Sequence, residues 1–509
     1  MKILSKFKQL KKDIKIVIIT ALIASCIGVY ATGTCIVAAT ADDVTYNNTT
    51  VSAALNDLYE LTQNYCPPGY ECRQLKYVTD CDNNKVYTTV PSNITGLAKI
   101  MAKNAYLDNG KSEYMTSCNG VSFNDISSDT NGRGIYEMAS TKNDTYPIYY
   151  YRGEVDNNVK FGGFCWKAIR TTDTGGVKLI YNGEPDQDGY CTNTTGDSTQ
   201  IGTSTFNSNY NSPAYVGYMY GTVYTDNYIT ESNLNTSYVY GGDITYSGGT
   251  YTLIDTMTTT VNWSNDYNTL SNNHYTCFST GTTCTSVYYI FHTTTSDAYY
   301  VTLTGGEDVD DALNKMFTNN TNSTIKSKID DWYSNYLTSY SSYIEDTIYC
   351  NDRSISKMGG WNQNGGNTLK ESSYLEFNSD YRAFSTHKPS LECSRELDKF
   401  TVSSSVGNGN LSFPIGVITI DEVMYAGGTL ASNNKYYLYN NKDYWTISPM
   451  NFRVDMGGVE SCIRSHGGLN GYSVGATGVG VRPVISLKAT DEILSGDGTQ
   501  TNPYVIKTS

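Results

Sequence analysis

Two apolar runs decide the fold of this chain: Phe161-Gly-Gly-Phe-Cys-Trp-Lys-Ala-Ile169 and Val177-Lys-Leu-Ile-Tyr181. Between them lies Thr172-Asp-Thr-Gly-Gly176, whose aspartate and glycines are typical of a turn. Short apolar runs bounded by turn residues favour strands. The pattern predicts two strands in the core of an α+β, β-rich fold.

The composition of the 509 residues also favours strands. Tyrosine occurs 46 times, and Thr, Asn, Ser and Gly are abundant; aromatic and β-branched residues suit strands, while Asn and Gly suit turns. The net charge is −14, and it becomes about −19 when the first 41 residues, with six lysines and one aspartate, are removed. This acidity argues against nucleic acid and anionic lipid as partners, because both attract basic surfaces.

Residues 16–41 form an uncharged, mainly apolar segment behind a lysine-rich flank, which is how exported chains begin. We expect residues 1–41 to be a cytoplasmic stub with a signal peptide or membrane anchor, and the chain from Asp42 onward to lie outside the cell. Three alternatives stay open. The length favours an uncleaved anchor in the membrane, Ala39-Thr-Ala41 fits a cleavage site, and Ile23-Ala-Ser-Cys26 resembles a bacterial lipobox.

The thirteen cysteines point to disulfides, because the close Cys/His spacing of a zinc site is absent. We therefore expect no metal and no cofactor. Proximity and strand context predict four pairs: Cys66 with Cys72, Cys165 with Cys191, Cys277 with Cys284, and Cys350 with Cys393. Cys81, Cys118 and Cys462 stay unassigned, so one exterior thiol should be left over.

Periodicity divides the exterior part into segments. Apolar residues at helical spacing from Val51 to Leu61 predict a stalk helix within residues 42–65, which pairs with copies of itself or docks on the next domain. Residues 66–144 fit a small disulfide-stapled subdomain with one helix at 99–107. Residues 145–509 fit a larger domain with a β insertion at about 200–304 and helices at 307–317 and 325–337.

The catalytic motifs in the sequence lack the surrounding residues that catalysis would require. Gly471-Tyr-Ser-Val-Gly475 matches the nucleophile elbow of hydrolases, but no histidine follows Ser473. The acids from Glu307 to Asp311 suit a helix N-terminus better than a catalytic carboxylate pair. We therefore predict no catalytic residue.

Several motifs between residues 145 and 490, weak singly and specific as a set, carry a family resemblance. They are Phe164-Cys-Trp-Lys-Ala-Ile-Arg170, Gly175-Gly-Val-Lys-Leu-Ile-Tyr181, Ile329-Asp-Asp-Trp332, Pro414-Ile-Gly-Val-Ile-Thr-Ile-Asp-Glu-Val-Met424, Tyr444-Trp-Thr-Ile-Ser-Pro449 and Gly480-Val-Arg-Pro-Val-Ile-Ser-Leu487. The chain resembles exported bacterial surface proteins of unknown function whose last domain is similar to the C-type-lectin-like fold shared with formylglycine-generating enzymes.

This resemblance implies that Trp445 and Val484-Ile485 are core and that Arg482 is a structural arginine paired with an acid. The enzymes of that fold use two nearby cysteines to bind copper. Only Cys462 lies in the corresponding block, so the resemblance implies a binding domain rather than an oxidase.

The candidate ligand-binding residues lie in the glycine-rich stretch between Trp445 and Arg482: Asn451, Phe452, Arg453, Asp455, Glu460, Arg464, His466, Asn470 and Tyr472. Because glycine lets the backbone turn tightly, we expect these side chains to project from loops. Arg and Tyr are also frequent in binding hot spots. The alternative is an ordinary solvated loop.

Taken together, these patterns predict a non-catalytic surface protein that binds an extracellular glycan or protein ligand, or mediates adhesion. A structural or self-assembling envelope protein is the first alternative, because the stalk helix and the tyrosine-rich insertion suit self-association. An enzyme of unrecognised type on the same fold is the second.

Overall fold

A computed structural model provides the structure of the chain. It describes residues 45–46, 49–50, 70–71, 77–79, 85–87, 90–91, 95–105, 123, 133–138, 148–172, 174–223, 228–230, 238–259, 274–277, 279–293, 297–356, 374–453 and 456–508. The chain divides into two compact units, the first comprising Met1–Val78 and Lys85–Asn93 and the second comprising Thr79–Asn84 and Ile94–Ser509.

The described residues of the first unit form short paired strands. β1 (Thr45–Tyr46) pairs with β2 (Thr49–Thr50), and β3 (Tyr70–Glu71) pairs with β6 (Val90–Pro91). β4 (Tyr77–Thr79) pairs with β5 (Lys85–Tyr87). Several predictions lie outside the described residues: the apolar segment, the stalk helix, the Cys66–Cys72 pair, Cys81 and Cys118. Within the described ranges, no helix has the length and apolar character needed to cross a bilayer.

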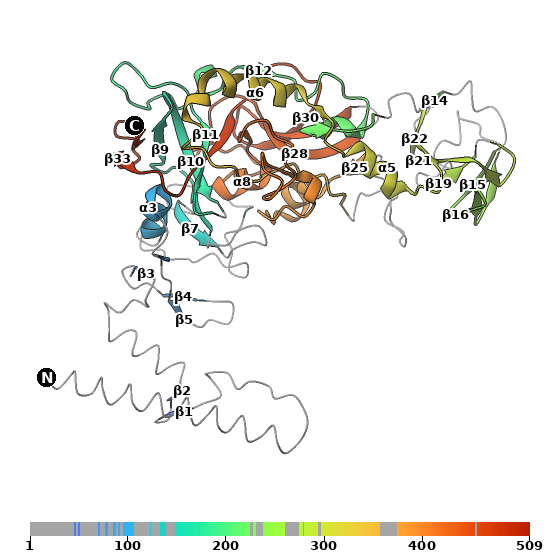
Figure 1. Ribbon diagram of the computed structural model, residues 1–509, viewed down its shortest axis with the longest axis horizontal. Helices are drawn as coiled ribbons and strands as arrows, with labels where there is room; N and C mark the ends of the chain where they lie inside the picture. Colours follow the sequence, from blue (N-terminus) through green and yellow to red (C-terminus); the bar gives the residue numbers. More distant parts are fainter. Residues whose placement is uncertain are drawn as a thin grey trace. The chain divides into compact units, whose positions relative to one another are not determined.

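A nine-stranded sheet is the largest sheet in the described part of the second unit (Figure 1). Its main path runs β27-β32-β11-β10-β9-β34-β33, and β8 joins β10 to β7. The strands are β7 (Gly134–Met138), β8 (Ile148–Arg152), β9 (Asn158–Phe161), β10 (Phe164–Thr171), β11 (Val177–Tyr181), β27 (Gly416–Val417), β32 (Pro483–Leu487), β33 (Ile493–Ser495) and β34 (Tyr504–Ile506). The predicted strands at 161–169 and 177–181 are confirmed as antiparallel neighbours, with a shifted start for the first, since Phe161 ends β9 and β10 begins at Phe164.

All eight residues of β10 are buried, including Lys167 and Arg170. Trp166 packs on one face, where its ring contacts Tyr181 at 5.8 Å and Trp332 at 6.2 Å between centroids. Because successive side chains of a strand point to opposite faces, Cys165 and Lys167 lie on the face away from Trp166. A strand buried on both faces must supply partners for its charged side chains, or it loses stability.

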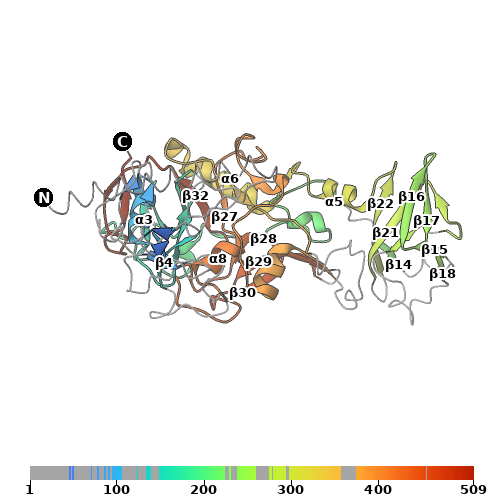
Figure 2. The ribbon, with the colours of Figure 1, turned by 90° about the horizontal axis from the view of Figure 1, so that it is seen from below.

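In the described residues, a second sheet has six strands, and most of them come from the C-terminal block. It comprises β12 (Thr203–Ser204), β25 (Tyr374–Glu376), β28 (Tyr444–Arg453), β29 (Gly457–Ile463), β30 (Leu469–Ser473) and β31 (Val479–Gly480). Figure 2 shows β28, β29 and β30 side by side. The chain passes from β31 in this sheet to β32 in the first, so Arg482 lies at the crossing. Trp445, Val484 and Ile485 are buried, as predicted.

The predicted insertion at about 200–304 consists of two parts, one that pairs with the main domain and one that forms separate sheets. β12 pairs with β31, and β13 (Met219–Tyr220) pairs with β23 (Thr321–Asn322), so residues 203–220 belong with the main domain. The later strands form sheets of their own: β14 (Tyr228–Thr230), β15 (Tyr238–Gly241), β16 (Asp243–Ser247), β17 (Thr250–Ile254), β18 (Met257–Thr259), β19 (His274–Thr276), β20 (Thr283–Cys284), β21 (Ser286–Thr293) and β22 (Asp297–Thr304). We call residues 228–304 the insertion from here on.

Helices pack against these sheets. The main ones are α3 (Gly96–Asn104), α5 (Val309–Met316), α6 (Thr324–Tyr336) and α8 (Ile420–Ala426), with short turns at η1 (Asp197–Thr199), η2 (Pro213–Val216), η4 (Thr338–Tyr340), α7 (Asn378–Asp380), η5 (Tyr381–Thr386) and η6 (Glu396–Asp398). The helices predicted at 99–107, 307–317 and 325–337 are confirmed with shifted ends. α6 lies alongside β11 (Figure 1), where Trp332 meets Tyr181.

Three of the four predicted disulfides are confirmed: Cys165–Cys191, Cys277–Cys284 and Cys350–Cys393. The last one lies beside the short pair of β24 (Tyr349–Cys350) and β26 (Lys399–Phe400). Cys462 is free and buried. Because disulfides persist in oxidising compartments, these bonds indicate an extracellular protein.

Candidate functional site

The predicted site between Trp445 and Arg482 is built from strands rather than loops. The described members of that set divide between β28 with Asn451, Phe452 and Arg453, β29 with Glu460, the β29–β30 connection with Arg464 and His466, and β30 with Asn470 and Tyr472. Asp455 lies outside the described residues. The prediction that these side chains project from loops is therefore wrong for the six that lie on strands.

Close packing explains the glycines that suggested loops. A Cβ atom on Gly471 would come within 2.3 Å of the Met450 sulfur, and one on Gly457 would come within 2.2 Å of the Tyr210 carbonyl oxygen. These positions hold glycine because neighbouring chain segments approach the strands closely. Such close approach is a common reason for glycine besides tight turns.

The predicted residues do not gather into a single site, although Arg464 and Tyr472 contact each other. Phe452 and Glu460 are buried in the core, and Asn451 donates to Asp380 Oδ2 over 3.4 Å. Arg464 instead stacks on the Tyr472 ring at 4.4 Å and lies 3.3 Å from Asp443 Oδ2, which also accepts a bond from the Tyr472 hydroxyl. His466 Nδ1 is 3.2 Å from Ser432 Oγ. The partly exposed Arg464–Asp443–Tyr472 cluster is thus satisfied internally.

A small cavity beside the Cys350–Cys393 disulfide collects many charged side chains. It holds about 30 Å³, room for about two water molecules. Among its lining residues, Arg170 and Lys178 both contact Glu422 Oε1, at 2.8 and 3.2 Å. Arg382 contacts both Asp421 and Asp352. The cations and acids neutralise one another, so this cavity fits a structural role.

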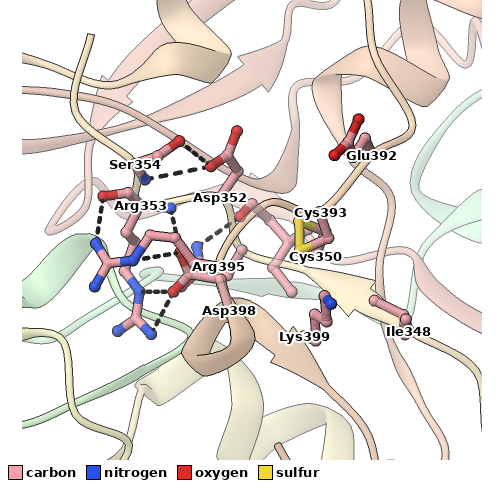
Figure 3. The surroundings of a disulfide bond; sticks show 12 residues. Ile348, Cys350, Asp352, Arg353, Ser354, Glu392, Cys393, Arg395, Asp398 and Lys399 are labelled. Atoms are coloured by element: carbon pink, nitrogen blue, oxygen red, sulfur yellow. Dashed lines mark hydrogen bonds and ion pairs between the residues drawn. A yellow bond between two sulfur atoms is a disulfide. The ribbon is translucent and has the colours of Figure 1, made fainter. Parts of the chain in front are cut away.

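Figure 3 shows the surroundings of the same disulfide. Glu392 lies next to Cys393, and the buried pair of Arg353 with Asp398 lies on the other side. Arg353 donates from Nε to Asp398 Oδ1 over 2.7 Å and from Nη1 to the Met219 carbonyl over 2.8 Å. The disulfide therefore ties together segments that already share a buried ion pair.

A larger cavity of about 330 Å³ opens over β10, and its size falls within the range of small-molecule sites. We call it the Lys167 cavity. Its described lining residues are Arg133, Glu154, Val155, Asp156, Lys167, Thr194, Thr195, Asn434, Tyr436, Tyr437, Tyr439 and Gln500. They come from the residue before β7, the β8–β9 turn, strand β10, the segment after Cys191, the segment after α8 and the C-terminal turn.

Covalent and hydrogen-bonded links hold these walls in place. The disulfide joins Cys165, two residues before Lys167, to Cys191, just before Thr194. Cys191 N–H donates to the Gln500 carbonyl over 2.8 Å, and Tyr437 N–H donates to the Gly153 carbonyl over 3.0 Å. The cavity is therefore formed by rigid parts of the fold, as a preformed ligand site requires.

Lys167 gives the cavity its chemistry. Its side chain is 6 % exposed, and no described residue forms a hydrogen bond or ion pair with its amine. Burial, reinforced by the nearby positive charge of Arg482 and opposed by Asp156, lowers the pKa of Lys167 to about 8. Buried lysines are usually paired, so an unpaired one facing a cavity suggests a ligand group that pairs with it.

The observed partners of Arg482 differ from the partner predicted from the sequence. It is fully buried, but its guanidinium donates to the Tyr181 carbonyl at 3.1 Å, the Leu438 carbonyl at 2.8 Å and Asn182 Oδ1 at 2.9 Å. These acceptors are neutral, so the predicted pairing with an acid is wrong. The sequence could not show this, because the acceptors come from segments about 44 and 300 residues away. Its positive charge adds to that of Lys167.

The sequence did contain a signal for this site. Lys167 stands in the middle of an apolar strand, between Trp166 and Ala168. A lysine on a solvated face would be unremarkable, but a lysine in a strand buried on both faces needs a partner. The tyrosines at 436, 437 and 439 gave no comparable signal, because tyrosine is common throughout the chain.

No protein-family model, curated protein or solved structure matches this chain. The geometry of the Lys167 cavity therefore carries the functional assignment.

Proposed function

We propose that the protein binds a small polar ligand in the Lys167 cavity and displays that site at the cell surface, with the N-terminal segment as membrane anchor or export signal. The observation that carries the proposal is the unpaired, buried amine of Lys167 in a cavity of about 330 Å³. Burying an unpaired charge reduces stability, and a binding site is the usual reason for such a cost.

One further feature argues against a catalytic role for Cys462. Its free thiol is buried, and burial raises its pKa far above that of a reactive cysteine. The motif resemblance between residues 145 and 490 supports a C-type-lectin-like fold for the main domain, and we propose that fold as the frame of the binding site.

The test is a ligand screen on the full-length protein in mild detergent. A panel of monosaccharides, amino acids and small organic acids is added, and the thermal unfolding midpoint is measured. At least one compound should raise the midpoint by a few degrees, because a ligand at about 100 times its Kd stabilises the folded state by about 2.7 kcal/mol. Lys167→Met should abolish this rise.

Two control variants test whether the rise in the unfolding midpoint depends on the Lys167 cavity. Lys160→Met removes a lysine from the adjacent strand β9, whose amine bonds the Gly189 carbonyl over 3.2 Å outside the cavity, so the rise should persist. Replacing Arg453, Arg464 and Tyr472 together by Ala should also leave it intact. A rise that survives Lys167→Met but disappears in the triple variant would move the site to the Arg464–Asp443–Tyr472 cluster.

A further inference from the structure

The charges around the Lys167 cavity favour an anion inside it. Lys167 is a buried cation in its wall, and the positive charge of the nearby buried Arg482, which bonds neutral acceptors, also acts on the Lys167 amine. The acids of the cavity lie nearer to solvent: Asp156 is exposed, and Glu154 is 3.8 Å from the amine of Lys435. Because solvent screens exposed charges more than buried ones, the inner end of the cavity is positive.

The rest of the lining suits a molecule rich in hydroxyl groups. Apart from Val155, the described lining side chains carry hydroxyls, amides or charges, and three of them are tyrosines. Threonine, asparagine and glutamine can each donate and accept hydrogen bonds with sugar hydroxyls. An aliphatic acid would need an apolar wall, which these residues do not provide.

The lining also favours a carboxylate over a phosphate group. Phosphate sites typically use helix N-termini or forked arginine contacts. None of the described helices begins at a lining residue of this cavity, and Arg133 is the one arginine among its described lining residues. A carboxylate can be held by one ammonium group with help from neutral donors.

We infer that the ligand of the Lys167 cavity is an acidic sugar, whose carboxylate accepts a hydrogen bond from the Lys167 ammonium while its hydroxyls bond the Thr, Asn and Gln side chains of the walls. This inference rests on the proposed function and adds the class of ligand.

The same arrangement makes binding depend on pH. The pKa of Lys167 is about 8, lowered by burial and by Arg482 and opposed by Asp156. The other titratable or charged groups that face the cavity are Arg133, Glu154, Tyr436, Tyr437 and Tyr439. A bound carboxylate stabilises the protonated amine, so its affinity should fall about tenfold per pH unit above pH 8.

The experiment compares three matched pairs by calorimetry on the full-length protein: glucuronate with glucose, galacturonate with galactose, and mannuronate with mannose. At pH 6.5 at least one uronate should bind at least tenfold more tightly than its neutral hexose. Lys167→Met should bring that ratio to about one. Lys167→Arg keeps a charged donor, so it should keep the preference for the uronate and extend it to pH 9.

Each outcome decides one claim. The inference is overturned if no uronate is preferred over its hexose, if the preference survives Lys167→Met, or if glucose 6-phosphate binds more tightly than all three uronates. A neutral hexose that binds and is lost in Asn434→Ala or Gln500→Ala would overturn the acidic-sugar class but keep the cavity as the binding site. A complete lack of binding, here and in the wider screen, would overturn the proposed function as well.

Discussion

At the scale of single residues, Glu460 combines full burial with two carboxylate oxygens that have no hydrogen-bond partner among the described residues. Burial raises the pKa of this carboxyl well above its ordinary value of 4.5, and the positive charge of Arg353 only partly opposes the shift. Below pH 4.5 the group is protonated in both the folded and the unfolded chain. Above pH 4.5 the unfolded chain releases the proton first, so the contribution of Glu460 to stability falls as pH rises.

Glu460→Gln should therefore become more stable relative to the wild type as pH rises. Between pH 5 and pH 8 the difference in unfolding free energy should grow by up to about 1.4 kcal/mol per pH unit, as measured by urea unfolding. Asp380, whose pKa burial raises to about 7, is present in both proteins and cancels in the comparison. Parallel stability curves for the two proteins would show that Glu460 is ionised in the fold.

At the scale of secondary-structure elements, the Glu422 side chain both caps the start of α8 and neutralises a cation on each of two strands. Glu422 Oε2 accepts from Thr419 N–H over 3.1 Å, and Glu422 N–H donates to Thr419 Oγ1 over 3.0 Å, a capping box. Its other oxygen contacts Arg170 of β10 and Lys178 of β11. Burial alone would raise the pKa of Glu422, but the two cations outweigh it and lower the pKa to about 2.

Glu422→Gln should cost about 3 to 5 kcal/mol of unfolding free energy at pH 7, because it removes the carboxylate that two buried cations contact while keeping most of the cap. The lowered pKa means that the wild type gains this stability above pH 4.5 and loses it as pH falls toward 2. The difference between the two proteins should therefore shrink between pH 4 and pH 2 in urea unfolding. Glu492→Gln, which removes an exposed partner of Lys507, should match the wild type throughout.

The sequence predicts those elements whose pattern lies within a few neighbouring residues. Apolar runs and a turn located β10 and β11, and helical spacing located α6. Short separations located the 277–284 disulfide. Two-residue strands such as β12 escaped, because their partner β31 lies over 270 residues away and their pattern is too short to read. The strands β29 and β30 escaped because their glycines, which allow close packing, looked like loop residues.

At the scale of the whole molecule, the insertion should be separable from the Lys167 cavity. The chain before it is held against the end of α5, which follows it, since Gly221 N–H and Thr222 N–H donate to the carbonyls of Met316 and Lys315, each over 2.9 Å. Replacing residues 224–306 with a short Gly/Ser linker should give a protein that folds with an unfolding midpoint within a few degrees of the wild type. It should also keep ligand binding. Loss of binding in a folded variant would assign the ligand to the insertion.

The most direct test of the central claim is the dissociation constant of the best compound from the screen, measured by calorimetry on the full-length wild type and on Lys167→Met. We predict that the variant binds at least tenfold more weakly, about 1.4 kcal/mol, while its unfolding midpoint is equal or higher because a buried unpaired charge has been removed. An unchanged dissociation constant in a folded variant would contradict the assignment of the Lys167 cavity as the binding site.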